Sequence, residues 1–376
     1  MKLYVVTASI RRLDNLKLLL HDFHERCLEK CDVHIVIVDE VEDATRKYNQ
    51  KIMSSFDNVH FYGVKERRQW FKSHFGSAWS KYECVIPEKC HAETSFGFIV
   101  AFEEGADVII ELDDDVALNQ GYDLGWHLRN SFNNEGFSVS AKGKWYNTIE
   151  NLVLNKEVIV FPRGHPYEEK CRLERYEWKN GSSPSVLNMG LWSGEPDLDA
   201  LTLIFYNGLN GACSLKSHGL KREKVVIEKG TYFALCSMNT AFLSKIIPAF
   251  YQLYMNQLGV DRFDDIWSGL FLKKIADYMG DDVSIGAPLL AHKKIPRDSF
   301  SDLRKEMEGM DLNEGLWRVV DSMSLTGNSY LDAYVSLTQN LSATVSSLGK
   351  TRTQRDFLEV QVEKMRLWTG LIDHLS

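Results

Sequence analysis

No stretch of the chain is apolar for long enough to suggest a transmembrane helix, so we expect no integral membrane segment. Residues 1–12 lack the apolar length and the small-residue cleavage site of a signal peptide. Cysteine is sparse as well, and the seven cysteines are an odd number scattered along 376 residues. Such usage fits a reduced compartment better than a disulfide framework, so we predict a cytoplasmic protein.

The chain also lacks an excess of basic residues. Its 44 Lys and Arg are outnumbered by 52 Asp and Glu, which gives a formal net charge of −8 and a pI near 5.8. An acidic surface argues against binding to nucleic acid or to an anionic membrane, but it leaves room for a local phosphate site. We find no internal repeat, low-complexity tract or flexible linker.

Apolar runs typical of buried strands occupy residues 2–7, 34–39, 59–63 and 107–116. Helical patterns follow the first run and cover residues 91–105. This alternation predicts an α/β fold with a mainly parallel, Rossmann-like sheet. In such sheets ligands bind outside the carboxyl ends of the strands.

The remaining chain divides into two parts. Residues 117–235 are richer in Gly, Asn, Ser and Pro, and we interpret them as loops and antiparallel strands that build the far wall of a cleft. Helical patterns cover residues 240–257 and 264–278, and they continue after Pro296 to the end. We therefore predict a main domain over residues 1–300 and a helical extension over 301–376, which packs on it or forms an oligomer surface.

Three consecutive aspartates, Asp113, Asp114 and Asp115, end the fourth apolar run. Adjacent carboxylates repel one another, and a divalent cation is a common compensation. Because strand residues alternate, Asp113 and Asp115 share a side if the strand stays extended. The alternative is a solvated acidic turn, but the buried run before the triplet favours a Mn²⁺ or Mg²⁺ site.

Other candidates have weaker individual signals. His292 follows a short apolar run and is either a structural residue or a further metal ligand. Asp264 and Asp265 begin a predicted helix, where they either cap it or face a substrate. Trp192 is either core or a surface on which a sugar stacks.

Several basic residues are candidate phosphate contacts, because the guanidinium fork matches oxyanions. They are Arg11, Arg12, Lys65, Arg67, Arg68 and Arg163. Arg163 differs from the rest because it lies between two prolines and beside a glycine, in residues 161–167. That setting is typical of a rigidly positioned loop.

Six segments in order resemble the reversibly glycosylated polypeptides, also called UDP-arabinopyranose mutases. The segments are TASIRRLDNL from Thr7, ELDDDV from Glu111, FPRGHPY from Phe161, GLWSGEPDLDA from Gly190, KGTYFALCSMNTAF from Lys229 and RFDDIWSGLFLK from Arg262. The chain departs from the family pattern at Lys170 and Ser237, where the family has Arg and Gly, and at Asp39-Glu40, where the family has Gln-Asp-Gly.

The resemblance implies a GT-A type nucleotide-sugar fold, a divalent metal (Mn²⁺ or Mg²⁺) and interconversion of pyranose and furanose UDP-sugars. It places Arg163 at the family's glycosylated arginine. We assign catalytic roles to Arg163, Asp264 and Asp265. We assign nucleotide binding to Thr7, Arg11, Asp39, Asp113 and Asp114. We assign sugar binding to Trp192, Asp197, Asp199 and Asn239. We assign metal binding to Asp113, Asp115 and His292.

Two other functions use the same residues. A metal-dependent glycosyltransferase would pass the sugar from UDP to an external acceptor, with Asp264 or Asp265 as a base. A self-glycosylated or nucleotide-sugar-binding partner protein would carry out no turnover, and its C-terminal helices would be its main surface.

Overall fold

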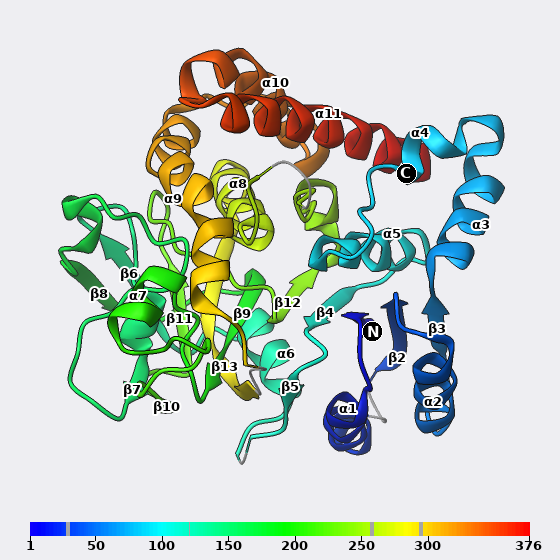
Figure 1. The fold of residues 1–376 in the computed structure, drawn as a ribbon. Helices are drawn as coiled ribbons and strands as arrows, with labels where there is room; N and C mark the ends of the chain where they lie inside the picture. Colours follow the sequence, from blue (N-terminus) through cyan, green and yellow to red (C-terminus); the bar gives the residue numbers. More distant parts are fainter. Residues whose placement is uncertain (28–30, 120, 256–258, 293–295) are drawn as a thin grey trace.

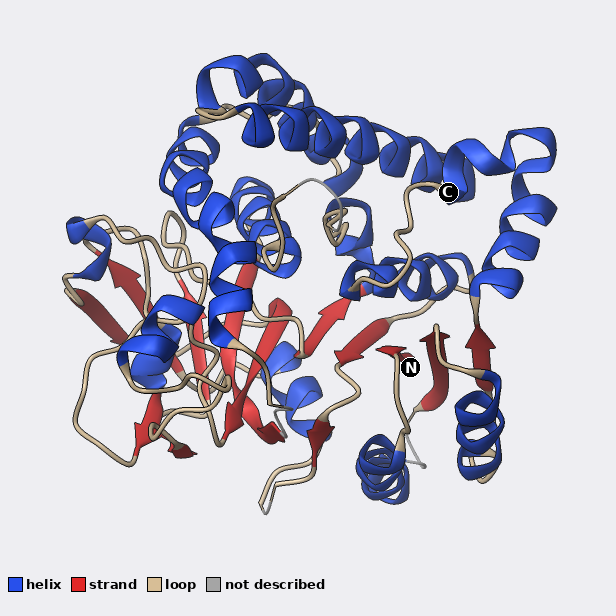
Figure 2. Ribbon diagram, in the orientation of Figure 1, coloured by secondary structure: helices blue, strands red, loops and turns tan. Residues whose placement is uncertain are grey.

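We describe the protein from a computed structural model, in which residues 1–27, 31–119, 121–255, 259–292 and 296–376 are described. An 11-stranded sheet runs through the molecule, in the order β3-β2-β1-β4-β12-β9-β13-β11-β6-β8, with β5 paired to β13. Helices lie above and below the band of strands in the view of Figure 2. The α/β class predicted from the sequence is confirmed.

One half of the sheet is parallel throughout. Its strands are β1 (Lys2–Ser9), β2 (Asp32–Asp39), β3 (Val59–Tyr62) and β4 (Val108–Leu112). Leu3, Val5 and Ile110 are fully buried, as expected for strands covered on both faces. The connecting helices are α1 (Asp14–Cys27), α2 (Asp43–Met53), α3 (Val64–Phe75), α4 (Trp79–Glu83) and α5 (Thr94–Glu103).

The other half of the sheet is mixed. The strands β12 (Asn239–Leu243), β9 (Ser185–Ser193), β13 (Asp282–His292), β11 (Lys224–Ile227), β6 (Phe137–Ala141), β8 (Tyr176–Asn180) and β5 (Val116–Ala117) build it. β12 is antiparallel to both of its neighbours, whereas β9 and β13 are parallel, as are β11 and β6. The predicted antiparallel middle segment is therefore only partly correct.

Smaller elements complete this half of the molecule. A separate two-stranded sheet joins β7 (Leu152–Leu154) to β10 (Ser217–Leu220). Two short helices, α6 (Gly125–Phe132) and α7 (Ala200–Phe205), lie within the segment predicted to contain only loops and strands.

The helix predicted over residues 240–257 is wrong. Its first part is β12, which pairs with β4 on one side and β9 on the other and buries Ala241 and Phe242 completely. A 3₁₀ turn, η5 (Ser244–Ala249), follows and contains Pro248. Proline cannot donate an intrahelical hydrogen bond, and the sheet partners of β12 outweigh its helical pattern. Residues 256–258 lie outside the described part of the chain.

The predicted helix over residues 264–278 is confirmed as α8 (Asp264–Met279), and three helices follow Pro296 as predicted. They are α9 (Ser299–Ser322), α10 (Tyr330–Leu348) and α11 (Arg352–Leu375). Figure 1 shows α10 and α11 along one side of the molecule, with the C-terminus beside α4. The ring of Trp368 stacks on that of Tyr251 with centroids 5.1 Å apart.

One continuous hydrophobic cluster includes residues of the sheet, α8 and all three C-terminal helices. The domain boundary at residue 300 stays a prediction. Within the described chain we find no helix that combines the length and the apolar character needed to span a bilayer.

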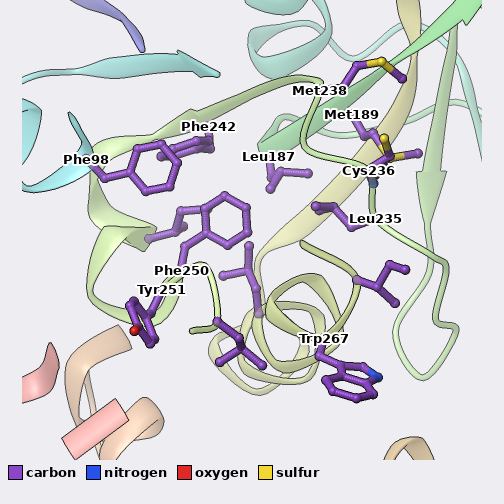
Figure 3. Close-up of a cluster of buried hydrophobic side chains, with 14 of the residues drawn as sticks. Phe98, Leu187, Met189, Leu235, Cys236, Met238, Phe242, Phe250, Tyr251 and Trp267 are labelled. Carbon is purple, nitrogen blue, oxygen red and sulfur yellow. Dashed lines mark hydrogen bonds between the residues drawn. The ribbon is translucent and has the colours of Figure 1, made fainter. Parts of the chain in front are cut away.

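A dense apolar cluster supports the segment that precedes β12. Figure 3 shows Cys236 and Met238 beside Met189, with Phe242 to the left and Phe250 lower down. The backbone N–H of Cys236 donates to the sulfur of Met189 at 3.1 Å. The segment is therefore held from beneath, and its other side is free to form the floor of a site.

Candidate functional site

A cavity of about 200 Å³ opens where β4, β13 and the start of α8 meet. It is lined by His91, Asp113, Asp115, Arg163, Asp197, Cys236, Ser237, Met238, Arg262, Asp264, Asp265, His292 and Arg297. A second cavity of about 260 Å³ adjoins it beside the end of β1 and shares His91, Asp113, Asp115 and Arg297 with it. Residues from eight separate sequence segments therefore converge on these two adjoining cavities, which together form one groove.

The aspartate triplet lies in a turn between β4 and β5 and not in an extended strand, so the division of its side chains comes from the turn and not from strand alternation. Asp113 and Asp115 line the larger site, whereas Asp114 points toward the loop after β1. There Asp114 Oδ2 accepts hydrogen bonds from the backbone N–H of Ile10 at 3.1 Å and the hydroxyl of Ser9 at 3.2 Å. Arg11 Nε lies 3.0 Å from Asp114 Oδ1. Asp114 thus holds the rim of the second cavity in place.

Asp115 and His292 form the pair best suited to a cation. His292 Nε2 lies 3.7 Å from Asp115 Oδ1, and that buried oxygen accepts no hydrogen bond. Burial alone would raise the pKa of Asp115, but the neighbouring His292 holds it below its usual value. One carboxylate and one imidazole, completed by substrate phosphate oxygens, suit Mn²⁺ or Mg²⁺.

The protein side chains do not form a complete ligand cage alone. Among the residues that the structure describes, no group of three or more His, Cys, Asp and Glu is arranged to hold a metal ion. A cation at Asp115 and His292 would therefore depend on oxygens from the ligand, as sites that bind a metal together with a nucleotide do.

His91, which the sequence analysis did not single out, lies between the two acidic groups of the site. Its Nε2 is 3.0 Å from Asp113 Oδ1, and its Nδ1 is 3.4 Å from Asp264 Oδ2. Burial alone would lower the pKa of His91, but the charges of Asp113 and Asp264 raise it well above the ordinary value. His91 is therefore a cation that joins β4 to α8. Its position directly before a buried helix was the available signal.

Glu111 is fully buried beneath His91 on β4. Burial raises the pKa of Glu111 from 4.5 to about 8, against the lowering effect of His91. A carboxyl whose pKa rises on folding is more protonated in the folded state, so its contribution to stability falls as pH increases between these two values.

We expect Glu111→Gln to change stability little at pH 5 and to stabilise the fold relative to the wild type at pH 9, by on the order of 1 kcal/mol. The amide removes a carboxylate that ionises in a buried position at the higher pH. Chemical unfolding at both pH values measures the two differences. The same difference at pH 5 and pH 9 would contradict the assignment.

Arg163 is the central basic group of the larger cavity and is only 9% exposed. Its Nη2 lies 3.0 Å from Asp197 Oδ2 and 3.6 Å from Asp265 Oδ2. Its Nη1 donates to the carbonyl of Arg262. Burial opposes the charge of Arg163, but Asp197 and Asp265 raise its pKa well above the ordinary value. Arg163 is therefore a fixed, permanently charged group.

The loop around Arg163 is as rigid as its sequence predicts. The backbone N–H of Arg163 donates to the carbonyl of Asp197 at 2.8 Å. Gly164 has a φ of +86°, and a Cβ at this position would lie 2.5 Å from Ile266 of α8. Only glycine combines this backbone conformation with such a close approach.

Both acids at the start of α8 face the cavity. Neither residue is the N-cap, which is Phe263 and makes no side-chain capping bond. Asp264 pairs with His91, and Asp265 accepts from the backbone N–H of Ser237 at 3.3 Å. Burial raises the pKa of Asp265 to about 6, although Arg163 lowers it. An acid that titrates near neutrality is suited to proton transfer.

Three residues assigned to sugar binding lie away from the lining. Trp192 is a core residue of β9, only 2% exposed. Asp199 caps α7 by accepting from the backbone N–H of Thr202 at 2.7 Å. Asn239 is fully buried and donates to the carbonyls of Leu191 and Pro288. Asp197 alone of the four lines the cavity, and the assignment of the other three to sugar binding stays a prediction that their positions do not support.

The residues assigned to nucleotide binding also differ in whether they reach the second cavity. Thr7 is fully buried, and its hydroxyl donates to the carbonyl of Leu112 at 2.6 Å, so it joins β1 to β4 and does not reach the groove. Arg11 lines the second cavity. Asp39 ends β2 with its carboxylate buried 3.5 Å from Arg46 Nε, and burial raises its pKa to about 6. Its role in nucleotide binding stays a prediction.

The other basic candidates lie outside both linings. Arg67 is buried and pairs with Glu40 and with Glu93, the latter at 2.9 Å. This is a structural ion pair, which corrects its assignment as a phosphate contact. Lys170 lies outside too, with its ammonium 5.2 Å from the ring of Trp317. Lys65 and Arg68 are exposed, and Arg12 lies over the ring of Tyr48 at 4.5 Å.

Solved structures with a similar arrangement include sugar-transferring enzymes. Glucosyl-3-phosphoglycerate synthase from Mycobacterium tuberculosis, in complex with Mn²⁺, UDP and phosphoglyceric acid, overlaps with a TM-score of 0.39 at 9% identity, over 87% of this chain and 80% of that one. A mannosyltransferase from Pyrobaculum calidifontis, with GDP-Man and Mn²⁺, gives a TM-score of 0.36 at 10% identity, over 99% and 84%.

Sequence relatives are closer. UDP-arabinopyranose mutase 1 of Arabidopsis thaliana is 32% identical over 189 residues, which are 47% of this chain and 49% of the relative. UDP-arabinopyranose mutase 2 of the same plant is 29% identical over 241 residues, which are 61% of this chain and 62% of the relative. The matched part of the chain thus spans about half to three-fifths of the length of these relatives.

The sequence model of one family covers nearly the whole chain. Described as "Reversibly glycosylated polypeptide", it matches residues 5–374 and so includes the aspartate triplet, Arg163, the start of α8 and the C-terminal helices. This match confirms the resemblance drawn from six short segments, and the chain belongs to the reversibly glycosylated polypeptide family.

Proposed function

We propose that this chain is a metal-dependent mutase that interconverts the pyranose and furanose forms of a UDP-sugar. The observation that carries the proposal is one cavity in which Arg163, buried between Asp197 and Asp265, faces the groove that Asp113 and Asp115 also line. Family membership and relatives named UDP-arabinopyranose mutases support the choice of reaction and of a UDP-pentose as the first substrate to test.

The nucleotide would occupy the second cavity, outside the carboxyl ends of β1 and β4, where ligands of open α/β sheets bind. Ser9, Arg11 and Asp113 line it there. Asp115 and His292 would hold Mn²⁺ or Mg²⁺ at the junction with the larger cavity. The cation, when bound, neutralises charge on the departing diphosphate.

The sugar would occupy the larger cavity among Asp197, Asp264 and Asp265. When the anomeric C–O bond to UDP breaks, its electron pair goes to the UDP oxygen. A sugar hydroxyl then bonds to the anomeric carbon and loses its proton, and the bond from that carbon to the former ring oxygen breaks, leaving its electron pair on that oxygen, which takes up a proton. The UDP oxygen then re-forms its bond to the anomeric carbon. The net change moves one proton from the hydroxyl that becomes the ring oxygen to the former ring oxygen. Asp265, whose pKa is raised to about 6 by burial, is suited to accept and return that proton.

Arg163 would act by charge and by position during turnover. All three of its nearby acceptors favour the protonated guanidinium, and a protonated guanidinium is a poor nucleophile. Glycosylation of Arg163 would require loss of that proton. We therefore propose that Arg163 orients the reacting sugar and its carboxylates, and that glycosylation of Arg163 is a side reaction of the same site.

The test is incubation of the protein with UDP-arabinopyranose and Mn²⁺ without an acceptor, followed by chromatography of the nucleotide sugars. A new UDP-furanose peak, lost when EDTA is added, is the expected result. UDP release that occurs only with an added acceptor would favour the glycosyltransferase. A mass shift on Arg163 with neither product would favour a self-glycosylated partner protein.

The same proposal includes a cytoplasmic location and a homo-oligomer formed through the C-terminal helices. The free thiols of Cys84, Cys90 and Cys236 support a reducing compartment. Fractionation of the expressing cell and light scattering of the purified protein test these two points separately.

A further inference from the structure

Two arginines of the larger cavity have no role in the reaction described so far. Arg262 directly precedes Phe263, the N-cap of α8, and Arg297 directly precedes Asp298, the N-cap of α9. Both line the larger cavity, and Arg297 also lines the second cavity. Arg297 therefore lies at the junction where the proposed sugar and nucleotide ends meet.

The two guanidinium groups share a counter-charge from the C-terminal helices. Asp302 Oδ2 of α9 lies 3.6 Å from Arg262 Nη1 and 3.4 Å from Arg297 Nε. Glu306, one turn later on α9, is fully buried and lies 2.7 Å from Arg262 Nε. The carboxylates of Asp302 and Glu306 on α9 thus hold the guanidinium groups of Arg262 and Arg297 in position at the cavity.

The backbone of Arg297 is fixed as well. Its N–H donates to the carbonyl of Asn210 at 2.8 Å. Two residues later, the N–H of Ser299 donates to the carbonyl of Leu209 at 3.1 Å, and its hydroxyl is hydrogen-bonded to the carbonyl of Gly208. Arg297 therefore projects from an anchored segment and not from a freely moving loop.

Two like charges this close are costly unless an anion joins them. Burial and the charge of Arg262 lower the pKa of Arg297, whereas Asp302 raises it. Asp302 lies 3.4–3.6 Å from both groups, and Glu306 adds a second carboxylate at Arg262, so Arg297 is the less compensated of the two arginines. A ligand carrying two or more negative oxygens could accept hydrogen bonds from both guanidinium forks where they line the cavity.

We propose that Arg262 and Arg297 form a diphosphate-binding subsite, presented by Asp302 and Glu306 of α9. The assignment rests on the proposed function, because it names the groups that hold the UDP diphosphate before and after the anomeric bond breaks. It gives Arg297 the position between the Asp115–His292 pair and the sugar cavity. It also makes α9 a part of the binding site.

Arg163 is the rival for this role, and its contacts argue against it. Its guanidinium is committed to Asp197, Asp265 and the carbonyl of Arg262, which leaves it facing carboxylates on the sugar side. Within the described part of the chain, Arg297 forms an ion pair with Asp302 alone, and it borders both cavities. The diphosphate therefore fits Arg297 and Arg262 better than Arg163.

Calorimetric titration with pyrophosphate, UDP and uridine, each with MgCl₂, tests the subsite. Arg297→Ala is expected to weaken pyrophosphate and UDP binding about tenfold to a hundredfold, because charge-assisted hydrogen bonds are lost. Uridine binding is expected to stay unchanged. Arg304→Ala is the matched control, since Arg304 is an exposed arginine of α9. Asp302→Asn should weaken pyrophosphate binding severalfold, again without an effect on uridine.

Unchanged pyrophosphate affinity in Arg297→Ala would overturn the proposal, and so would an equal loss of uridine binding or no pyrophosphate binding by the wild type. The chromatographic assay is independent of these titrations. If the wild type made no UDP-furanose but bound pyrophosphate through Arg297, the mutase proposal would fail and the diphosphate subsite would stand.

Discussion

Arg163→Gln is expected to lower the rate of UDP-furanose formation by about 100- to 1000-fold, the loss typical when one preorganised electrostatic group is removed from a site. Glutamine keeps some hydrogen-bonding capacity but not the charge. Asp197 and Asp265 would then face each other across the cavity without the guanidinium that separates them. Their repulsion would also move the sugar-binding carboxylates.

The same substitution is expected to destabilise the fold by about 3–5 kcal/mol near neutral pH, because it leaves buried carboxylates unpaired. This loss should shrink at pH 5, where protonation of Asp265, whose pKa burial raises to about 6, removes the repulsion. Chromatographic rates and chemical unfolding at pH 5 and 7.5 measure the two effects. Arg163→Lys should recover most stability but little activity, since one ammonium cannot replace the fork.

Arg318→Gln supplies the control, because Arg318 lies on α9 with its side chain half exposed. It is expected to behave as the wild type in both measurements. Full turnover by Arg163→Gln would remove Arg163 from the mechanism. A stability loss that is the same at pH 5 and 7.5 would show that packing of the Arg163 side chain, and not its charge, stabilises the loop.

Asp115→Asn is expected to weaken metal-dependent UDP binding at least about tenfold and to abolish the dependence of turnover on Mn²⁺. The amide loses the negative charge that a hard cation prefers, and only His292 is left as a protein ligand. Titration of UDP with and without MnCl₂ gives the metal-dependent part directly. The fold should be little affected, since Asp115 borders the cavity and is not part of the core.

Asp57→Asn is the matched control, because Asp57 is exposed and lies in the turn before β3. An Asp115→Asn variant that bound UDP equally well, and gained as much from MnCl₂ as the wild type, would mean that the cation binds elsewhere. Asp113 would then be the next candidate ligand. Its Oδ1 lies 3.0 Å from His91 Nε2, so a cation there would have to displace or share this histidine.

The order of the six motifs was sufficient to bring several residues of the candidate site together. It located Asp113, Asp115, Arg163 and the acids of α8, because each either follows a buried strand, begins a helix or lies in a proline-restrained loop, although the aspartates lie in a turn after β4 and not in an extended strand. His91 carried no such pattern in the sequence. Its proximity to Asp113 and Asp264 depends on how α5 packs against β4, which is a tertiary feature.

Trp192 and Asn239 show that the motifs also contain residues that do not line the cavity. Both lie in motif segments, yet Asn239 is a hydrogen-bonding node between β9, β12 and β13, and Trp192 fills the core. A motif alone does not distinguish residues that touch the ligand from residues that hold the strands around it. Burial separates the two classes, and burial follows from strand order, which the sequence pattern leaves open.

The sequence patterns did not predict α2, and they predicted a helix at β12, where the structure has a strand. α2 buries only Asn49 and Met53, so its sequence shows almost no apolar stripe. β12 was mistaken for a helix because it is only five residues long and its apolar end, Ala241 to Leu243, runs directly into a 3₁₀ turn. Short segments of this kind are decided by their neighbours in the sheet, not by their own pattern.

The attachment of α9 to the groove has a consequence for exchanging parts between members of the family. Asn313 of α9 donates to the carbonyl of Gly164, and Glu306 holds Arg262, so one helix touches both basic loops. A chimaera joined at residue 300 would separate these loops from the side chains that fit them. Transferring the specificity of a relative to this chain would therefore require replacing α9 together with the loops around Arg163 and Arg262.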